Sequence, residues 1–367
     1  MLNTHRGLTM GNEVLNRYVS LELEDAYGVE NSSANTIYYG EVDDESFATR
    51  MDLLTRQDMS HYGSAKSVTG GEYSEGGYNM AVQLDTFLGA TLLAFFPKYS
   101  FSDPLHIWEE PTDGTHAYAT DADSYDSYTI RVGREDKEHT YVGMMANRLS
   151  LTANVGEYVM LSCDWVGCRE KATATLTNTD GTLSFEGDAL DALYFSNGTV
   201  TFNNSGNTAV GVVKSVSFEI NMNRDTDNAY ALGNSTYVRQ PPSQRREVTG
   251  TIEFNQIIHS ANNLDGDAAA IPTYDTLVAE DGLAYNPGSS NDALTLLFEE
   301  ESNGTTNFLK MEFFNIRFEA PEASVSGRDT QTMSVGFVAL YDDTTESMMK
   351  VTADGGDFGT SAIVWNA

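Results

Sequence analysis

The sequence predicts a mainly β protein made of two tandem antiparallel β-sandwich or barrel lobes, each carrying one short α-helix. Most segments alternate apolar and polar residues with a period of two, and turn residues interrupt them at short intervals. This pattern is typical of antiparallel strands joined by short turns. One arrangement of segments also occurs twice along the chain, which indicates a duplicated unit.

The repeated unit consists of an extended segment, a long polar loop and a second strand that contains glycine. Its first copy comprises Met51–Thr55, Gln57–Tyr73 and Gly77–Leu84. Its second copy comprises Ser215–Ile220, Asn221–Glu247 and Val248–Asn255. Loops of this length between neighbouring strands of a compact domain are often functional.

Both copies continue in the same order. A short helix that is apolar on one side is predicted over Thr86–Phe96, before Pro97, and over Pro272–Ala279. A hairpin and a pair of long strands follow, at Tyr128–Val142 and Arg148–Val166 in the first copy and at Leu294–Met311 and Asn315–Leu340 in the second. We therefore expect an N-terminal arm (1–17), a first lobe (18–170), a structured connection (171–204), a second lobe (205–353) and a C-terminal arm (354–367).

The composition is strongly acidic. The 367 residues carry a net charge of -33, from 54 Asp and Glu against 21 Lys and Arg, which argues against nucleic-acid binding by phosphate neutralisation. Because 40% of the residues are hydrophobic and 11% aromatic, the acidity predicts a solvated surface rather than disorder. An acidic, lysine-poor chain resembles proteins of extreme halophiles, where salt screens the repulsion between carboxylates; an acidic mesophilic or marine protein is the alternative.

Motifs for catalysis, metals and membranes are weak. No histidine forms a HExxH motif, and carboxylate pairs are uninformative among 54 acids. Cys163 and Cys168 lack zinc or redox spacing, and Asp121–Asp126 lacks the glycine and terminal glutamate of an EF-hand loop. Met1–Gly11 has no apolar signal core, and the longest apolar run, Leu88–Phe96, is too short to span a membrane. The sequence predicts neither an enzyme nor a cofactor.

Several segments together resemble the tail tube (major tail) proteins of long-tailed phages and archaeal siphoviruses, in particular the duplicated-lobe type. They are Lys66–Gly71, Arg148–Gly167, Lys214–Ile220, Arg246–Ile252 and Phe318–Leu340, and the resemblance covers about residues 35–353. The extreme acidity and the loop Asn221–Arg246, which contains two adjacent prolines, depart from the family pattern.

The resemblance implies a structural virion protein of the tail, assembled in the host cytoplasm without a membrane. Its inner sheets would join around a ring, and stacked rings would enclose the channel for genome ejection, through which DNA passes without specific binding. A duplicated lobe implies trimeric, pseudo-hexameric rings; hexameric rings are the alternative. The implied partners are the tape measure, tail tip and terminator proteins. Other interpretations are a surface β-sandwich binding module such as an adhesin, and a tail-tip or secretion-tube protein.

Two sets of residues are candidates for functional roles. Alternation places one set on a polar face opposite Phe218, Ile220, Ile252 and Phe254, so that it faces either the lumen or the outer solvent: Ser217, Glu219, Asn221, Thr251, Glu253, Asn255, Asn79 and Gln83. The other set is a basic cluster in a long loop, which we expect to pair with acids of the adjacent ring: Arg239, Arg245 and Arg246.

Overall fold

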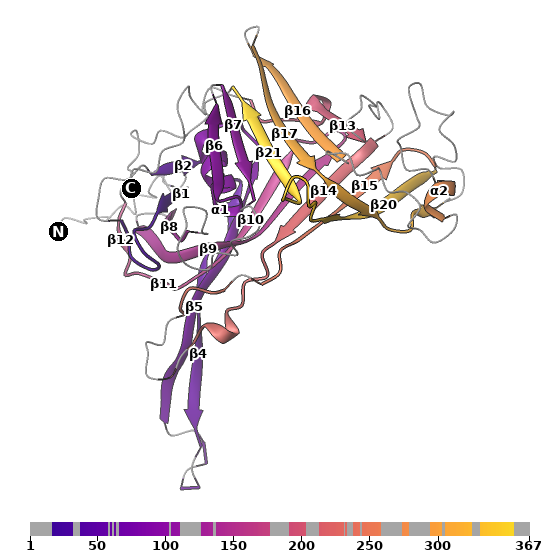
Figure 1. Ribbon diagram of the computed structural model, residues 1–367. Helices are drawn as coiled ribbons and strands as arrows, with labels where there is room; N and C mark the ends of the chain where they lie inside the picture. Colours follow the sequence, from indigo (N-terminus) through magenta and orange to yellow (C-terminus); the bar gives the residue numbers. More distant parts are fainter. Residues whose placement is uncertain are drawn as a thin grey trace, which may run out of the picture.

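The structure is a computed structural model, shown in Figure 1. It describes residues 17–31, 37–57, 59–60, 62–63, 66–102, 104–110, 126–134, 137–176, 191–202, 213–230, 232, 238–242, 244–257, 274–278, 294–302, 305–324 and 331–355. These residues form two antiparallel sheets, so the predicted mainly β fold is confirmed. In the described part of the chain neither sheet closes on itself.

The main path of the larger sheet crosses both halves of the chain. In spatial order its strands are β18 (Asn315–Phe318), β20 (Thr332–Leu340), β15 (Glu247–Phe254), β14 (Val213–Asn221), β9 (Lys137–Asn154), β10 (Met160–Gly167), β5 (Lys66–Ala81) and β3 (Asp44–Glu45). Two further strands lie near its ends: β19 (Glu322–Ser324) pairs with β20, and β4 (Ala48–Arg56) pairs with β5.

A side branch of this sheet forms along the first half of β9. Its strands are β1 (Tyr18–Leu23), β2 (Tyr38–Gly40), β8 (Tyr128–Arg134), β11 (Arg169–Glu170) and β12 (Ala174–Thr175). The 18-residue strand β9 was predicted as two separate elements. It stays continuous because Gly143, with φ +68, lets the chain bend where a Cβ would lie 2.8 Å from the Cys168 side chain.

The smaller sheet also contains strands from both halves. Its order is β13 (Gly198–Phe202), β16 (Leu294–Ser302), β17 (Thr305–Phe313), β21 (Met349–Asp354), β7 (Leu105–Glu109) and β6 (Lys98–Ser102). Strand β21 of the second half pairs with β7 of the first, just as β14 pairs with β9 in the larger sheet. Both sheets therefore run without interruption from one half of the chain to the other.

The two sheets pack face to face through aromatic residues. The ring of Phe313 on β17 lies 5.3 Å from Phe218 on β14 and 5.6 Å from Phe337 on β20, measured between centroids. Phe202 on β13 stacks on Phe254 of β15 at 6.3 Å. Because all five side chains are almost completely buried, the apolar face predicted by the alternation forms the core of the sandwich.

Short helices occur where the sequence predicts them. Helix α1 (Thr86–Phe95) begins after Asp85, whose carboxylate accepts a hydrogen bond from the Leu88 N–H at 2.7 Å, and it is buried on nearly every side. It packs against Trp165 and Tyr78 of the larger sheet. Helix α2 (Tyr274–Val278) lies within the second predicted helix. The described residues also include two short 3-10 turns, Phe195–Asn197 and Asp227–Ala229.

One predicted loop is mostly strand. Instead of the loop Gln57–Tyr73, β4 and β5 continue as a long hairpin that projects from the body, at the bottom of Figure 1. Val68, Thr69 and Tyr73 favour strand conformation, and cross-strand pairing continues to Arg56 and Lys66. The loop prediction for this segment, based on its polar and glycine residues, is therefore wrong for most of its described length. Almost all of the two predicted arms lies outside the described residues.

Candidate lumen-facing surface and stacking elements

The open face of the larger sheet carries the polar residues that the alternation predicts. On β14, Phe218 and Ile220 are buried, whereas Ser217, Glu219 and Asn221 remain partly exposed. On β15, Ile252 and Phe254 are buried; Thr251 is exposed and Glu253 partly exposed. Since Ser217 lies directly opposite Thr251, these side chains form one continuous surface.

The same surface extends into the first half of the chain. Glu219 lies opposite Ser150 of β9, Ser150 opposite Ser162 of β10, and Ser162 opposite Asn79 of β5. The structure therefore brings Asn79 into one cross-strand row with Glu219. Asn255 and Gln83 lie just beyond the ends of β15 and β5, respectively.

Several residues of this surface were missed in the sequence. Ser150, Thr152 and Asp164 belong to it, because they alternate with the buried Leu149, Leu151 and Cys163. The alternation in Arg148–Ala153 was visible, but nothing local in the sequence showed that β9 lies beside β14. Long-range pairing placed these residues on the surface.

The charges on the central strands of this face are mostly acidic, and the cations Arg148 and Lys214 are paired. Arg148 forms an ion pair with Glu219, and Lys214 Nζ lies 2.8 Å from Glu253 Oε1. Burial raises the pKa of Asp164; Arg148 lowers it in part and Glu219 raises it further. The surface thus presents carboxylates, amides and hydroxyls, with little free positive charge to hold a phosphate.

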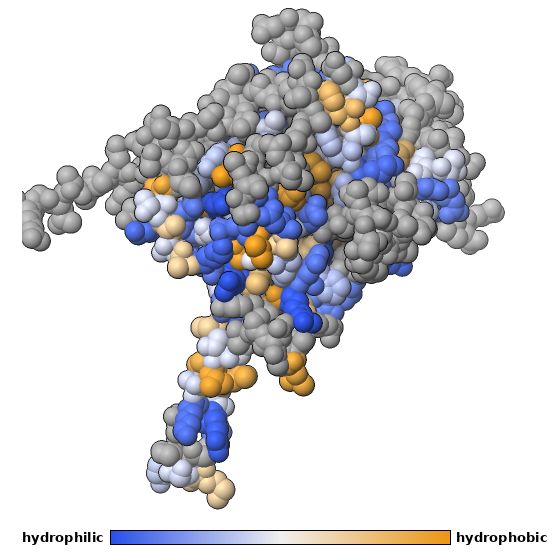
Figure 2. Space-filling model, turned by 60° about the vertical axis from the view of Figure 1, so that its left-hand side comes forward, coloured by the Kyte–Doolittle hydropathy of each residue, from blue (hydrophilic) through white to orange (hydrophobic). Residues whose placement is uncertain are grey.

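The projecting hairpin exposes large apolar side chains. Met51, Leu53, Leu54 and Val68 are each 59–64% exposed, and Met59 and Tyr62 in its tip are fully exposed. Figure 2 shows apolar groups beside hydrophilic ones along this projection. Exposed apolar surface of this kind marks a site of protein contact.

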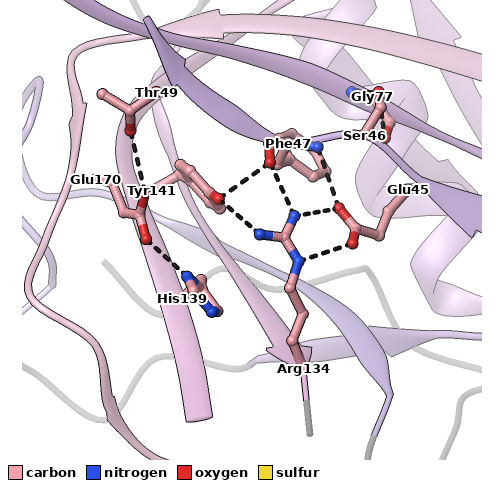
Figure 3. A network of polar contacts seen from close by, with 9 residues as sticks. All are labelled: Glu45, Ser46, Phe47, Thr49, Gly77, Arg134, His139, Tyr141 and Glu170. Carbon is pink, nitrogen blue, oxygen red and sulfur yellow. Dashed lines mark hydrogen bonds and ion pairs between the residues drawn. The ribbon is translucent and has the colours of Figure 1, made fainter.

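A polar network fixes the root of the hairpin to the body (Figure 3). Arg134 of β8 binds both carboxylate oxygens of Glu45 and donates to the Phe47 carbonyl at 2.8 Å. The Tyr141 hydroxyl donates to the same carbonyl at 3.1 Å. Glu170 adds a second link, accepting from Thr49 at 3.1 Å and lying 2.7 Å from His139. The arm therefore begins from a fixed position.

Described parts of the chain between β14 and β15, around Tyr230 and Val238, lie along this root. The Val238 N–H donates to the Glu72 carbonyl at 3.1 Å, and a Cβ on Gly71 would lie 2.8 Å from the Tyr230 ring. Two of the predicted arginines, Arg239 and Arg245, are exposed here.

Arg246 differs from both neighbours in the predicted cluster. Its side chain is only 9% exposed, and Nε lies 3.3 Å from Glu110 Oε1. One of its terminal nitrogens donates to the Phe95 carbonyl at 3.0 Å, and the guanidinium lies over the Phe96 ring at 4.6 Å. The contact with an adjacent ring stays a prediction for Arg246; within the chain this residue links β15 to the end of α1.

Metal, thiol and membrane-spanning features are few among the described residues. No group of three or more His, Cys, Asp or Glu side chains in this part of the chain is arranged to hold a metal ion. The run Asp121–Asp126, except for Asp126, lies outside it. Cys163 and Cys168 are both free thiols. Among the described helices, none combines the length and apolar character needed to cross a membrane.

The joined sheets, the polar open face and the projecting apolar hairpin define a structural β-sandwich subunit with surfaces suited to self-association. A family model for phage tail tube proteins matches residues 15–255, and the chain belongs to this family. Membership makes it a virion component that assembles into tubes and contacts other tail proteins. A search of curated proteins finds no significant match.

Proposed function

We propose that this protein is the tail tube subunit of a siphovirus-like particle, forming stacked rings that enclose the channel for genome ejection. The observation that carries the proposal is the pairing of β9 with β14, which joins the two halves of one chain edge to edge. A junction of the same kind between chains would close a ring.

The strand order supports a duplicated lobe. In the first half the order across the larger sheet is β4-β5-β10-β9, and in the second half it is β14-β15-β20-β18. The short strand β3 pairs with β5 next to β4, and the short strand β19 pairs with β20 next to β18. Corresponding strands occupy corresponding places, and each half supplies one short helix. We take the two lobes as residues 18–170 and 205–353.

The duplicated order leaves two complementary edges. In the described chain, β18 and β19 pair only with β20, and β3 and β4 pair only with β5. The edge of β18 and β19 corresponds to β9, and the edge of β3 and β4 corresponds to β14. Strands β9 and β14 are the two that pair with each other within the chain. Pairing β18 and β19 of one copy with β3 and β4 of the next repeats that junction, satisfies exposed backbone groups and closes a ring from three copies.

Electron microscopy of the purified protein at high salt tests the proposal, together with native mass measurement of single rings. We expect tubes of uniform bore and three copies per ring; six copies would replace the trimer by the hexamer. Discrete monomers that bind a glycan array would instead support a surface binding module.

We propose that the open face lines the lumen, with Glu219, Glu253 and Asn79 toward the channel. Carboxylates repel the phosphates of the passing DNA, and hydrated amides and hydroxyls let it pass without specific binding. Arg239 and Arg245 are the proposed cationic contacts to the adjacent ring, and tape measure, tail tip and terminator proteins would meet the tube ends. Assembly would take place in the host cytoplasm.

Replacing Ser217 and Thr251 by lysine should convert the channel into a DNA-retaining surface. The two positions are direct neighbours, so three copies would add six cations per ring. We expect preformed tubes of the variant to retain about tenfold more DNA fragment than wild-type tubes at about 0.1 M salt, with the excess lost at high salt. Asp343→Lys with Glu346→Lys, two exposed turn residues, is the matched control. Equal retention by both variants would contradict the lumen assignment.

We further propose a halophilic host, because the net charge of -33 requires screening. The melting temperature should rise by several degrees from about 0.1 M to about 2 M KCl as the carboxylates are screened. Calorimetry across this series measures the rise, with sucrose as the uncharged comparison. A melting temperature that stays constant or falls with KCl would oppose the proposal.

A further inference from the structure

One face of the projecting hairpin combines apolar and cationic side chains. Leu54 lies directly opposite Val68, and two residues nearer the tip Arg56 lies opposite Lys66. All four side chains are exposed, and alternation places them on the same face. Like charges in opposite positions destabilise a hairpin in isolation. Among the described residues no ion pair joins Arg56 or Lys66 to a carboxylate, and Asp52 lies two residues before Leu54 on the same strand.

The other face of the hairpin meets its own chain only at the root. Near the root, Gly71 contacts the Tyr230 ring, and Glu72 accepts the backbone bond from Val238. Beyond the root both faces are exposed, Leu53 on this one and Leu54 on the other, but only the face of Leu54 and Val68 also carries the two cations Arg56 and Lys66. We call it the hairpin docking face.

An exposed aromatic patch lies at the opposite end of the larger sheet. It consists of Val155 and Tyr158 in the turn between β9 and β10, with Tyr194 and Phe195 before β13; their exposed fractions are 42–59%. Tyr158 and Tyr194 are bridged, the Phe195 N–H donates to the Glu157 carbonyl at 3.1 Å, and the Tyr194 and Phe195 rings are in contact. The two segments thus form one surface, which we call the turn patch.

The rim of the turn patch is acidic. Glu157 lies within the turn, Asp191 precedes Tyr194, and Glu299 and Glu300 belong to the neighbouring β16. The Asn197 side chain donates to the Glu299 carbonyl at 2.6 Å, which places this strand beside the patch. Burial raises the pKa of Glu300, and the negative charge of Asp191 adds to the effect. Apolar groups beside acids complement apolar groups beside cations.

Strand β5 connects the two surfaces. It begins within the hairpin at Lys66 and runs for 16 residues to Ala81, about 50 Å at ~3.3 Å per residue. The next residue, Val82, bonds both segments of the turn patch: its N–H donates to the Val159 carbonyl, and its carbonyl accepts from the Leu193 N–H, each at 2.8 Å. The docking face and the patch therefore lie at opposite ends of one strand. In Figure 1 the hairpin projects at the bottom, and β13, which follows the patch, lies near the top.

We propose that the turn patch is the receptor for the hairpin docking face of a second copy of this chain, in the adjacent ring. A contact between different surfaces at opposite ends of a subunit is head-to-tail, and repetition produces an open stack rather than a closed dimer. Leu54 and Val68 then cover Tyr158 and Phe195, and Arg56 and Lys66 meet the acidic rim. The inference rests on the proposed function, since it names the partner surface that stacks the rings.

The first test substitutes each surface separately. Leu54→Asp on the hairpin and Phe195→Asp on the patch should each leave single rings intact and reduce the number of tubes at least tenfold in electron micrographs. Thr55→Asp, on the other face of the hairpin, is the matched control and should stack normally. Circular dichroism verifies folding of each variant.

The second test links the surfaces covalently. Val68→Cys combined with Phe195→Cys, in a Cys168→Ser background, should form disulfide-linked chains between rings on mild oxidation; Thr55→Cys with Phe195→Cys should not. Charge reversal adds a rescue: Arg56→Glu with Lys66→Glu should block stacking, and Glu157→Lys with Glu299→Lys should restore it in the same chain.

The outcomes separate the two proposals. Absence of rings and tubes in the wild-type protein would overturn the proposed function itself. Tubes that form in the wild type and persist in both aspartate variants, without the disulfide, would overturn the turn patch as receptor and leave the tube function standing.

Discussion

Replacing Arg246 with alanine should lower the free energy of unfolding by about 3–5 kcal/mol, because it leaves a buried carboxylate without its partner. Glu110 is only 6% exposed, and Arg246 provides the cation beside it. Glu110 also accepts a hydrogen bond from the Met348 N–H at 2.9 Å, so the pair lies where α1, β15 and the chain before β21 meet. Its loss weakens contacts between the two halves.

Urea unfolding at constant high salt measures this effect. Arg245→Ala is the matched control, because Arg245 is the adjacent arginine and is exposed, and it should change the stability by less than about 0.5 kcal/mol. Arg246→Met combined with Glu110→Leu should recover most of the loss, since an apolar pair removes the uncompensated charge. Equal, small effects of both single alanine variants would show that Arg246 has no such role.

The arginine cluster illustrates which part of the site the sequence predicts. Arg245 and Arg246 are adjacent and chemically identical, so a reading of the charge cluster treats them together. The strand phase separates them: Arg246 has the same parity as Val248, Ile252 and Phe254, which all face the core. The alternation would separate the two arginines if it were extended to the residues just before the strand.

For the fold as well, local sequence patterns predict which residues of a strand are buried but not which strands pair. The strict alternation of β20 and β14 predicts which residues are buried, and the structure agrees at every second position. By contrast, no local pattern shows that β14 pairs with β9 or β21 with β7, because pairing depends on the three-dimensional meeting of compatible edges. Ser150 and Asp164 were missed for this reason, whereas Ser217 and Glu219 were found.

The hairpin was misread because its sequence contains signals for both a loop and a strand. Gly70, Gly71 and several hydroxyl residues favour a loop, and exposure removes the apolar alternation expected of a half-buried strand. Pairing of β4 with β5 still makes the segment extended. A strand that is solvated on both faces has no hydrophobic period to recognise.

Gly76, at the root of this hairpin, carries the second large expected effect. Its φ is +152, and a Cβ there would lie 2.3 Å from Phe47 Cα and 2.6 Å from the Phe47 nitrogen. Backbone cannot rotate away as a side chain can, and Arg134 and Tyr141 hold the Phe47 carbonyl in place. Gly76→Ala must therefore displace β5 or break this anchor. We expect a loss of about 2–4 kcal/mol in unfolding free energy.

Gly156→Ala separates backbone strain from steric overlap. Gly156 has φ +90, but nothing lies within 4 Å of the position of its Cβ, so this variant should cost only the strain of about 1–2 kcal/mol. Urea unfolding compares the two, and hydrogen exchange of β4 and β5 locates the damage. Gly76→Ala should expose the hairpin amides and abolish stacking, because an arm that no longer leaves the body in a fixed direction cannot reach the adjacent ring. Normal tubes with protected hairpin amides would show that the anchor at Phe47 does not orient the arm.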